Sequence, residues 1–272
     1  MKKFQVVGLL SCLLASALAN SQPSENTVLW QQALTGEHRT PAYMQRDQYR
    51  HPKATLTFFG VSPSSTVVEI WPGGGWYTEI LAPLLRDQGM LYAAHFTADS
   101  EVTFFRNSRR DFEAKLSAKP AIYDKVVTTS LMPPEQLSIA PAASADAVLT
   151  FRNVHNWVKS GSAEAVFVAM YQALKPGGVL GVVEHRAKPG TSEANMAASG
   201  YVTEARVKAL AQQAGFVFVA SSELNANSKD STSHPAGVWT LPPSLRLGDE
   251  RQAHYLAIGE SDRMTLKFIK PQ

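Results

Sequence analysis

The fold is decided by residues 67–75, which read Val67-Val68-Glu69-Ile70-Trp71-Pro72-Gly73-Gly74-Gly75 and lead into a helical pattern from Trp76 to Leu85. A short β-branched run, a glycine cluster and a 3.6-residue period predict a strand, a tight turn and a helix. Glycines in such a turn let the backbone approach a ligand where a Cβ atom would collide. The ligand crevice of a doubly wound sheet lies at the carboxyl ends of its strands, so this turn is the first candidate site.

The same alternation of strand and helix continues toward the C-terminus. Further strands are expected at 90–96, 123–129, 146–151 and 179–184, with helices at 100–116, 163–174 and 203–214. This alternation is typical of a parallel sheet with helices on both faces. The last two predicted strands, 216–221 and 255–269, have no helix between them and should pair antiparallel at one edge. We therefore predict an α/β fold with a doubly wound, mostly parallel seven-stranded sheet and an antiparallel edge strand.

Composition excludes several classes of protein. The 272 residues are 44% hydrophobic and 18% charged, which is typical of a folded chain and not of a disordered or fibrous one. A net charge of +3 gives no case for nucleic-acid binding. The single cysteine excludes a disulfide framework and a cysteine-based zinc site.

The N-terminus has the pattern of a secretory signal peptide over residues 1–19. Lys2 and Lys3 precede an apolar run over 6–18, and Ala17 and Ala19 are the small residues that a signal peptidase needs. We expect a periplasmic or secreted protein with no stable membrane insertion after signal cleavage. An uncleaved tether and a lipoprotein anchored at Cys12 are the less favoured alternatives, because the apolar run is short for a span and shorter still upstream of Cys12. Residues 20–60 then form an N-terminal leader and helical cap, and 61–272 form the α/β domain.

Common nucleotide-binding motifs do not fit the glycine turn. The dinucleotide fingerprint needs a third glycine where this chain has Thr78, and the Gly-Lys-Ser/Thr of a phosphate-binding loop is absent. No Gly-x-Ser-x-Gly elbow of a serine hydrolase is present either.

Three motifs, in order, resemble those of class I S-adenosylmethionine (SAM)-dependent methyltransferases. Glu69–Gly75 resembles the family's first motif, Asp146–Trp157 its fourth-strand motif, and Leu174–Gly178 the turn before strand five. The resemblance covers about Thr66 to Gln272. It implies a Rossmann-like methyltransferase fold with an inserted antiparallel seventh strand, SAM as cofactor, and methyl transfer to a small-molecule acceptor.

A narrower resemblance is to an exported bacterial group of predicted methyltransferases. It rests on Arg50-His51-Pro52, Gly75-Trp76-Tyr77-Thr78, Phe151 to Trp157, and Val183-Glu184-His185-Arg186. Together with the signal peptide, it implies that the acceptor is methylated in the cell envelope.

A sulfonium cofactor favours carboxylate and aromatic groups over a basic loop. The candidate cofactor-binding residues are Glu69, Gly73, Gly74, Gly75, Tyr77, His95 and Asn153.

Two positions depart from the family. Trp71 stands where glycine is usual, so the loop runs differently or the indole fills part of the pocket. His95 stands where an acidic residue usually takes the ribose hydroxyls, with Asp99 four residues beyond.

The candidate catalytic residues are His155, His185 and Glu184, which follow or end predicted strands at the crevice. Histidine titrates near neutral pH, so His155 is the first candidate for a base or an acceptor-orienting group, with a loop-capping role as the alternative. Glu184, His185 and Arg186 could instead form an ion-paired structural corner. The three catalytic candidates could converge on a metal, but no His-Glu-x-x-His spacing is present, so no metal site is predicted.

Specificity for the acceptor is expected to come from the leader and from a loop over 225–243, which would act as a lid. The candidate substrate-binding residues are Tyr49, Arg50, Asn156, Arg186, Asn225 and Trp239. Tyr49 and Arg50, together with Arg46 and His51, would close the side of the pocket opposite the lid loop, although an amphipathic surface helix predicts similar residues. Two other functions remain open: a periplasmic binding or accessory protein that keeps the fold without methyl transfer, and a cofactor-independent enzyme using Glu184, His185 and His155. The sequence leaves the oligomeric state open.

Overall fold

The computed structural model describes Met1 and residues 24–272. The signal-peptide prediction for residues 1–19 therefore lies almost entirely outside the described residues. Among those residues, no helix is long and apolar enough to cross a membrane.

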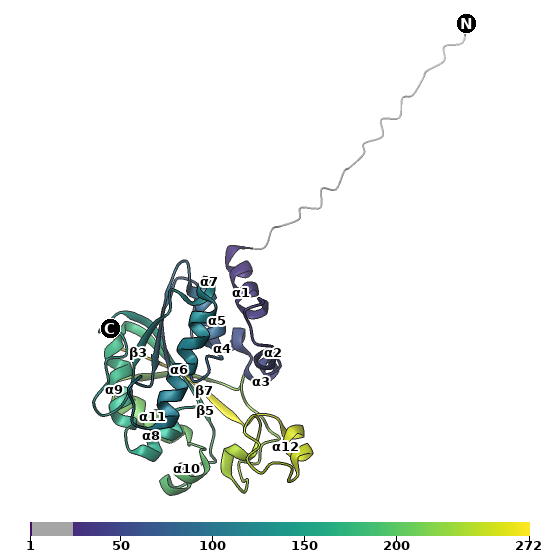
Figure 1. Cartoon of the computed structure of the whole chain (residues 1–272), viewed down its shortest axis with the longest axis vertical. Coiled ribbons are helices and arrows are strands. Elements are labelled where there is room, and N and C mark those ends of the chain that lie inside the picture. The colour runs from purple at the N-terminus through teal and green to yellow at the C-terminus, as the bar shows by residue number, and fades with distance from the viewer. Residues whose placement is uncertain (2–23) are drawn as a thin grey trace.

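A seven-stranded sheet in the order β3-β2-β1-β4-β5-β7-β6 forms the centre of the protein (Figure 1). Its strands are β1 (Thr66–Ile70), β2 (Met90–His95), β3 (Val127–Ser130), β4 (Ala145–Phe151), β5 (Leu174–His185), β6 (Val217–Ser222) and β7 (Arg263–Ile269). β1 to β5 pair in parallel, while β7 lies between β5 and β6 and is antiparallel to both. The predicted α/β fold, including the antiparallel pairing of the last two strands, is confirmed.

Both faces of the sheet are covered, because successive side chains of each strand point to opposite sides. Val68 belongs to one apolar cluster and Val67 to the other. The first cluster holds residues of α8 (Val154–Ser160), α9 (Ala163–Ala173), α10 (Glu193–Ser199) and α11 (Glu204–Gln213). The second holds residues of α1 (Glu25–Thr35), α4 (Pro52–Phe58), α5 (Thr78–Leu85) and α7 (Pro120–Tyr123). One more long helix is α6 (Thr103–Ala118).

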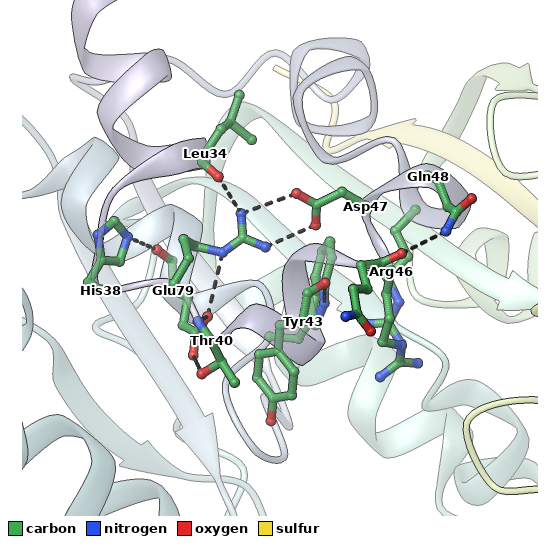
Figure 2. A network of polar contacts seen from close by, with 12 residues as sticks. Leu34, His38, Thr40, Tyr43, Arg46, Asp47, Gln48 and Glu79 are labelled. Carbon is green, nitrogen blue, oxygen red and sulfur yellow. Dashed lines mark hydrogen bonds and ion pairs between the residues drawn. The ribbon is translucent and has the colours of Figure 1, made fainter.

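The leader is tied to α5 by a buried polar network (Figure 2). Arg39 pairs with Asp47 at 2.9 Å and donates to the Leu34 carbonyl at 3.0 Å. The Glu79 carboxylate of α5 accepts from the backbone and hydroxyl of Thr40 at 2.9 and 2.6 Å. Because Arg39 also lies 3.5 Å from Glu79, this network ties the segment that carries α2 (Pro41–Met44) and α3 (Asp47–Arg50) to α5.

Some expected elements differ in the structure. The strand expected over 123–129 begins only at Val127, after α7 has ended at Tyr123. Within the helical cap expected over residues 20–60, α3 and α4 are separate helices, because His51 adopts a left-handed conformation (φ 42°) immediately before Pro52. A residue before proline is disfavoured in the helical region, so the first helix ends there. The strand expected over 255–269 begins only at Arg263. Residues before it form α12 (Gln252–Ile258), which ends at Gly259 with φ 87°.

Candidate functional site

Two neighbouring cavities lie beyond the carboxyl ends of the parallel strands. The smaller one, of about 320 Å³, is here called the arginine cavity, because Arg46, Arg50 and Arg152 line it. The larger one, of about 920 Å³, is called the aromatic cavity, after Phe96, Phe104 and Phe105 in its wall. Five residues line both cavities: Trp71, Gly73, Asn153, His155 and Trp239. The crevice is therefore at the edge of the sheet that the sequence predicts.

The glycine turn forms one wall of the arginine cavity. Gly73 has φ 57°, a conformation that favours glycine, and it lines both cavities. A Cβ atom on Gly74 would lie 2.5 Å from the Tyr43 hydroxyl of the leader, so the close approach of α2 requires glycine there. Gly75 lines neither cavity and packs against Phe112. The turn thus brings bare backbone to the cavity at Gly73 and Gly74.

Glu69, at the end of β1, lines the arginine cavity and is almost completely buried. Burial raises the pKa of Glu69 to about 7, although the hydrogen bond from the Thr78 hydroxyl and the charge of Lys115 oppose this. That hydrogen bond is 2.6 Å long. A cation bound beside Glu69 would favour the ionised carboxylate, because an opposite charge lowers the pKa of an acid.

Trp71 stands where the resembled family usually has glycine, and its backbone adopts the left-handed conformation that favours glycine. Its φ is 44°, and its backbone N–H still donates to the Ala94 carbonyl of β2 at 2.8 Å. The indole N–H donates to the Leu131 carbonyl at 2.9 Å, and the ring lies 4.8 Å from Phe96. The sequence left two alternatives: a loop that runs differently, or an indole that fills part of the pocket. In the structure the indole lies in the pocket region and forms a wall shared by both cavities.

His95 supports the glycine turn from beneath and lines neither cavity. It is completely buried. Its Nδ1 accepts from the Phe96 backbone N–H at 2.7 Å, so Nε2 carries the proton and donates to the Gly73 carbonyl at 3.2 Å. Burial lowers the pKa of His95 to about 4, and the ring is neutral. Asp99 is exposed.

His155, Glu184 and His185 come together as the sequence predicts. Glu184 is completely buried in β5, and its Oε1 lies 3.0 Å from Nδ1 of His155 at the start of α8. The same carboxylate accepts from the backbone N–H groups of His185 at 2.8 Å and His155 at 3.3 Å. The two imidazole rings lie 5.3 Å apart. Both histidines line the arginine cavity.

The two histidines differ in their surroundings. Nδ1 of His185 lies 2.5 Å from the Ser261 hydroxyl. Burial holds the pKa of His185 well below its usual range, and the positive charges of Arg152, Arg263 and Arg50 add to this. His185 is therefore a neutral imidazole at neutral pH, whereas His155 has the carboxylate of Glu184 as its partner.

His155, Glu184 and His185 are also a group that could hold a metal ion, since one ligand atom from each lies within 4.8 Å of the others. Both Glu184 oxygens, however, already accept hydrogen bonds from the two histidines or their backbone. In this arrangement the carboxylate orients His155.

The candidate substrate residues divide into two groups. Arg50 and Trp239 line the arginine cavity, and Asn156 lines the aromatic cavity. Tyr49, Arg186 and Asn225 line neither. Arg186 forms two-pronged ion pairs with Glu223 and Asp262, which is the ion-paired corner of the alternative interpretation. Asn225 is buried and donates to the hydroxyls of Thr55 and Thr265.

The loop expected to act as a lid is held by internal polar contacts. Asp230 accepts from the Tyr201 hydroxyl at 2.9 Å and lies 2.7 Å from Nε2 of His234. The 3-10 helix η1 (Gly237–Thr240) places Trp239 against both cavities. The loop contributes a fixed wall through this residue.

Arg152, Glu260 and Ser261 are among the residues of the arginine cavity that sequence reasoning missed. The sequence signal for Arg152 is its position directly after the apolar run of β4. In the structure it adopts φ 64° there. Glu260 and Ser261 precede β7, in a stretch that was expected to be the interior of a strand.

The fold is that of class I SAM-dependent methyltransferases. A SAM-dependent methyltransferase from Aquifex aeolicus matches with a TM-score of 0.55 at 14% identity, covering 85% of this chain and 94% of that one. A geranyl diphosphate methyltransferase in complex with SAM matches with a TM-score of 0.54 at 12% identity, over 84% and 88% of the two chains. The [4+2]-cyclase SpnF matches with a TM-score of 0.52 at 16% identity, over 84% and 82%. No protein-family model and no curated protein matches the sequence.

Proposed function

We propose that this protein is a SAM-dependent methyltransferase acting on a small acceptor in the cell envelope. The observation that carries the proposal is the pairing of His155 with buried Glu184 at 3.0 Å, at the crevice of a methyltransferase fold and facing the same cavity as the glycine turn. Methyl transfer requires positioning of two reactants and, where the acceptor must lose a proton, a base.

The residues of the two cavities fit SAM in part. Gly73 and Gly74 offer bare backbone, Glu69 offers a buried carboxylate for a cation, and the aromatic cavity offers ring faces. His95 is turned away, so the contacts to a ribose would have to come from other groups. When bound, SAM would supply an electrophilic methyl group to an acceptor nucleophile.

In this proposal, His155 removes the proton of the acceptor. Glu184 accepts the hydrogen bond of His155 Nδ1–H, which leaves the lone pair of Nε2 unprotonated. The carboxylate also stabilises the imidazolium that forms when Nε2 takes the proton. Trp71 and Trp239 line both cavities together with His155, and their apolar rings would limit the water around it.

Binding of SAM to the purified protein, measured by calorimetry and thermal shift, tests the first step. We expect stabilisation at millimolar SAM, because a ligand that binds only the native state raises its stability by mass action. Transfer of a labelled methyl group from SAM to a small-molecule extract of the cell envelope tests the second step. His155→Ala should reduce transfer by about 100-fold or more with little loss of SAM affinity, as expected for loss of a general base.

Exposed His254 provides the matched control, and His254→Ala should leave transfer unchanged. If SAM neither binds nor stabilises the protein, the methyltransferase proposal is wrong. A larger loss of SAM affinity than of transfer in His155→Ala would instead place His155 in the cofactor site.

A binding or accessory protein that keeps the fold is the second candidate. It is favoured by the position of His95, which is buried beneath the turn and offers nothing to a ribose. The similarity to a [4+2]-cyclase also supports a fold that is not restricted to methyl transfer. Under this alternative, the cavities would bind a ligand other than SAM, and the same calorimetry would separate the two.

A further inference from the structure

Four arginines and a single carboxylate meet at one end of the arginine cavity. They are Arg46 and Arg50 from the leader, Arg152 after β4, Arg263 at the start of β7, and Glu260 just before it. Glu260 accepts from Nε of Arg46 at 2.6 Å, lies 3.2 Å from Nε of Arg50 and 3.0 Å from Nη1 of Arg263. These four positive charges and one negative charge are called the arginine cluster.

Several donors of the arginine cluster have no hydrogen-bond partner within residues 24–272, although the Arg50 guanidinium lies 4.5 Å from the centroid of the Trp76 ring. Nη1 and Nη2 of Arg50 and Nη2 of Arg46 are buried and unpaired, and Arg50 is only 1% exposed. Arg263, in contrast, also donates to the carbonyls of Ser261 and Tyr49. Buried donors without a partner carry the full cost of desolvation, so unpaired guanidinium groups facing a cavity indicate a ligand that accepts hydrogen bonds.

Arg152 contributes a guanidinium group to the same wall. Among the hydrogen bonds of the described chain, none involves its side chain, although it lines the cavity. Burial lowers the pKa of Arg152 to about 10; the negative charge of Glu260 opposes this, while the like charges of Arg263 and Arg46 lower the pKa further. An anion in the cavity would relieve this repulsion.

We propose that the arginine cluster binds a small dianion, with carboxylate or phosphate groups, that forms the acidic part of the acceptor. Arg50 and Arg152 present planar forks that match two oxygens of such a group. The net positive charge of the arginine cluster does not match SAM as a whole. SAM has one carboxylate and two positive groups, so it is itself a net cation. The part of this inference that calls the ligand an acceptor rests on the proposed function. The anion site itself rests on the unpaired guanidinium donors.

The other groups facing the cavity are compatible with an anion at this end. His185 is neutral, and burial raises the pKa of Tyr77 to about 12, so neither adds charge at neutral pH. Glu69 lines the cavity at the end of the strand that leads into the glycine turn, and burial raises its pKa to about 7. His155 lines the same cavity, so an acceptor held by its acidic group at the arginine cluster can present its nucleophile to His155.

Thermal shift and calorimetry with inorganic phosphate and with succinate test the proposal on the purified protein. Each should raise the melting temperature by about 5 °C at one hundred times its dissociation constant. Acetate, and sodium chloride at matched ionic strength, should have a much smaller effect. Absence of any shift with both dianions would overturn the proposal, whatever the result with SAM.

Arg50→Gln and Arg152→Gln should each weaken dianion binding by about tenfold or more, the effect of losing a charge-assisted hydrogen bond. Arg152→Gln should leave the unliganded protein as stable as before, because its side chain makes no hydrogen bond within the described chain. A purely structural arginine would give the reverse pattern. Exposed Arg110 pairs only with exposed Asp111, so Arg110→Gln is the matched control and should bind dianions normally.

Repeating the titrations with saturating SAM separates the two possible sources of the acidic group. Dianion binding that persists with SAM present supports an acceptor site. Strict competition between phosphate and SAM would assign the cluster to the SAM carboxylate and overturn the proposal. If dianions bind and SAM does not, the anion site stands and the methyltransferase proposal fails.

Discussion

Glu69 is a buried acid whose ionisation opposes folding. Its pKa is about 7 in the folded chain against 4.5 for the free group, so its contribution to stability is fully present below pH 4.5 and is lost as the pH rises through 7. We expect Glu69→Gln, which can still accept from Thr78, to raise the free energy of unfolding by up to roughly 3 kcal/mol at pH 8 and by little at pH 4. Urea denaturation at both pH values measures the difference.

Exposed Glu101 is the control for this substitution. Glu101→Gln should change the free energy of unfolding by the same small amount at pH 4 and pH 8. Equal effects of Glu69→Gln at the two pH values would contradict the raised pKa of Glu69.

The residues that sequence reasoning finds best are those attached to recognisable strands. His155, Glu184 and His185 follow or end apolar runs, so the parallel sheet alone brings them to one edge. Arg152 and Glu260 line one cavity only because the leader and the segment before β7 pack over that edge. Arg50 and Glu260, which are in contact, are 210 positions apart in the sequence. No local pattern encodes such a contact, which depends on the packing of distant loops.

The leader elements α1 to α3 depend on one charged residue of α5. Glu79 accepts from Thr40 and pairs with Lys115 at 2.7 Å, and these hydrogen bonds hold its pKa below the usual value although burial alone would raise it. We expect Glu79→Gln to lower the free energy of unfolding by about 3 kcal/mol, because buried Arg39 loses the carboxylate that lies 3.5 Å from its Nε. Limited proteolysis should then cut the leader before the α/β domain.

Glu113→Gln is the matched control for the leader. Glu113 is half-exposed and pairs with Arg109 one helical turn away, so its loss should cost about 0.5 kcal/mol and leave the leader resistant. If the leader of Glu79→Gln is cut no faster than that of the control, the network in Figure 2 does not hold the leader in place.

Strands with continuous apolar runs are found from sequence, while elements set by single residues are not. β1 and β4 are buried on both faces and stand out as β-branched or apolar stretches. Residues 252–258 have similar apolar content, but Gly259 ends them as a helix before β7 can begin. The split of α3 from α4 likewise depends on one left-handed residue, His51.

The location of the whole molecule follows, in our proposal, from residues 1–19. We expect the protein in the periplasmic or extracellular fraction, with an N-terminus at Asn20 by mass spectrometry. Ala19→Tyr should block cleavage and leave the precursor bound to the membrane, because a signal peptidase needs a small residue there. Ser21→Tyr, beyond the cleavage site, should be processed normally. A full-length protein in the cytosol would contradict the signal peptide.

The shared wall between the two cavities has an optical consequence. Of the five tryptophans of the chain, Trp71, Trp76 and Trp239 line one or both cavities. Trp30 and Trp157 are buried in the apolar clusters and line neither cavity. Indole emission depends on the polarity around the ring, so the intrinsic fluorescence of the unlabelled chain reports occupancy of either cavity, with Trp71 placed to sense both.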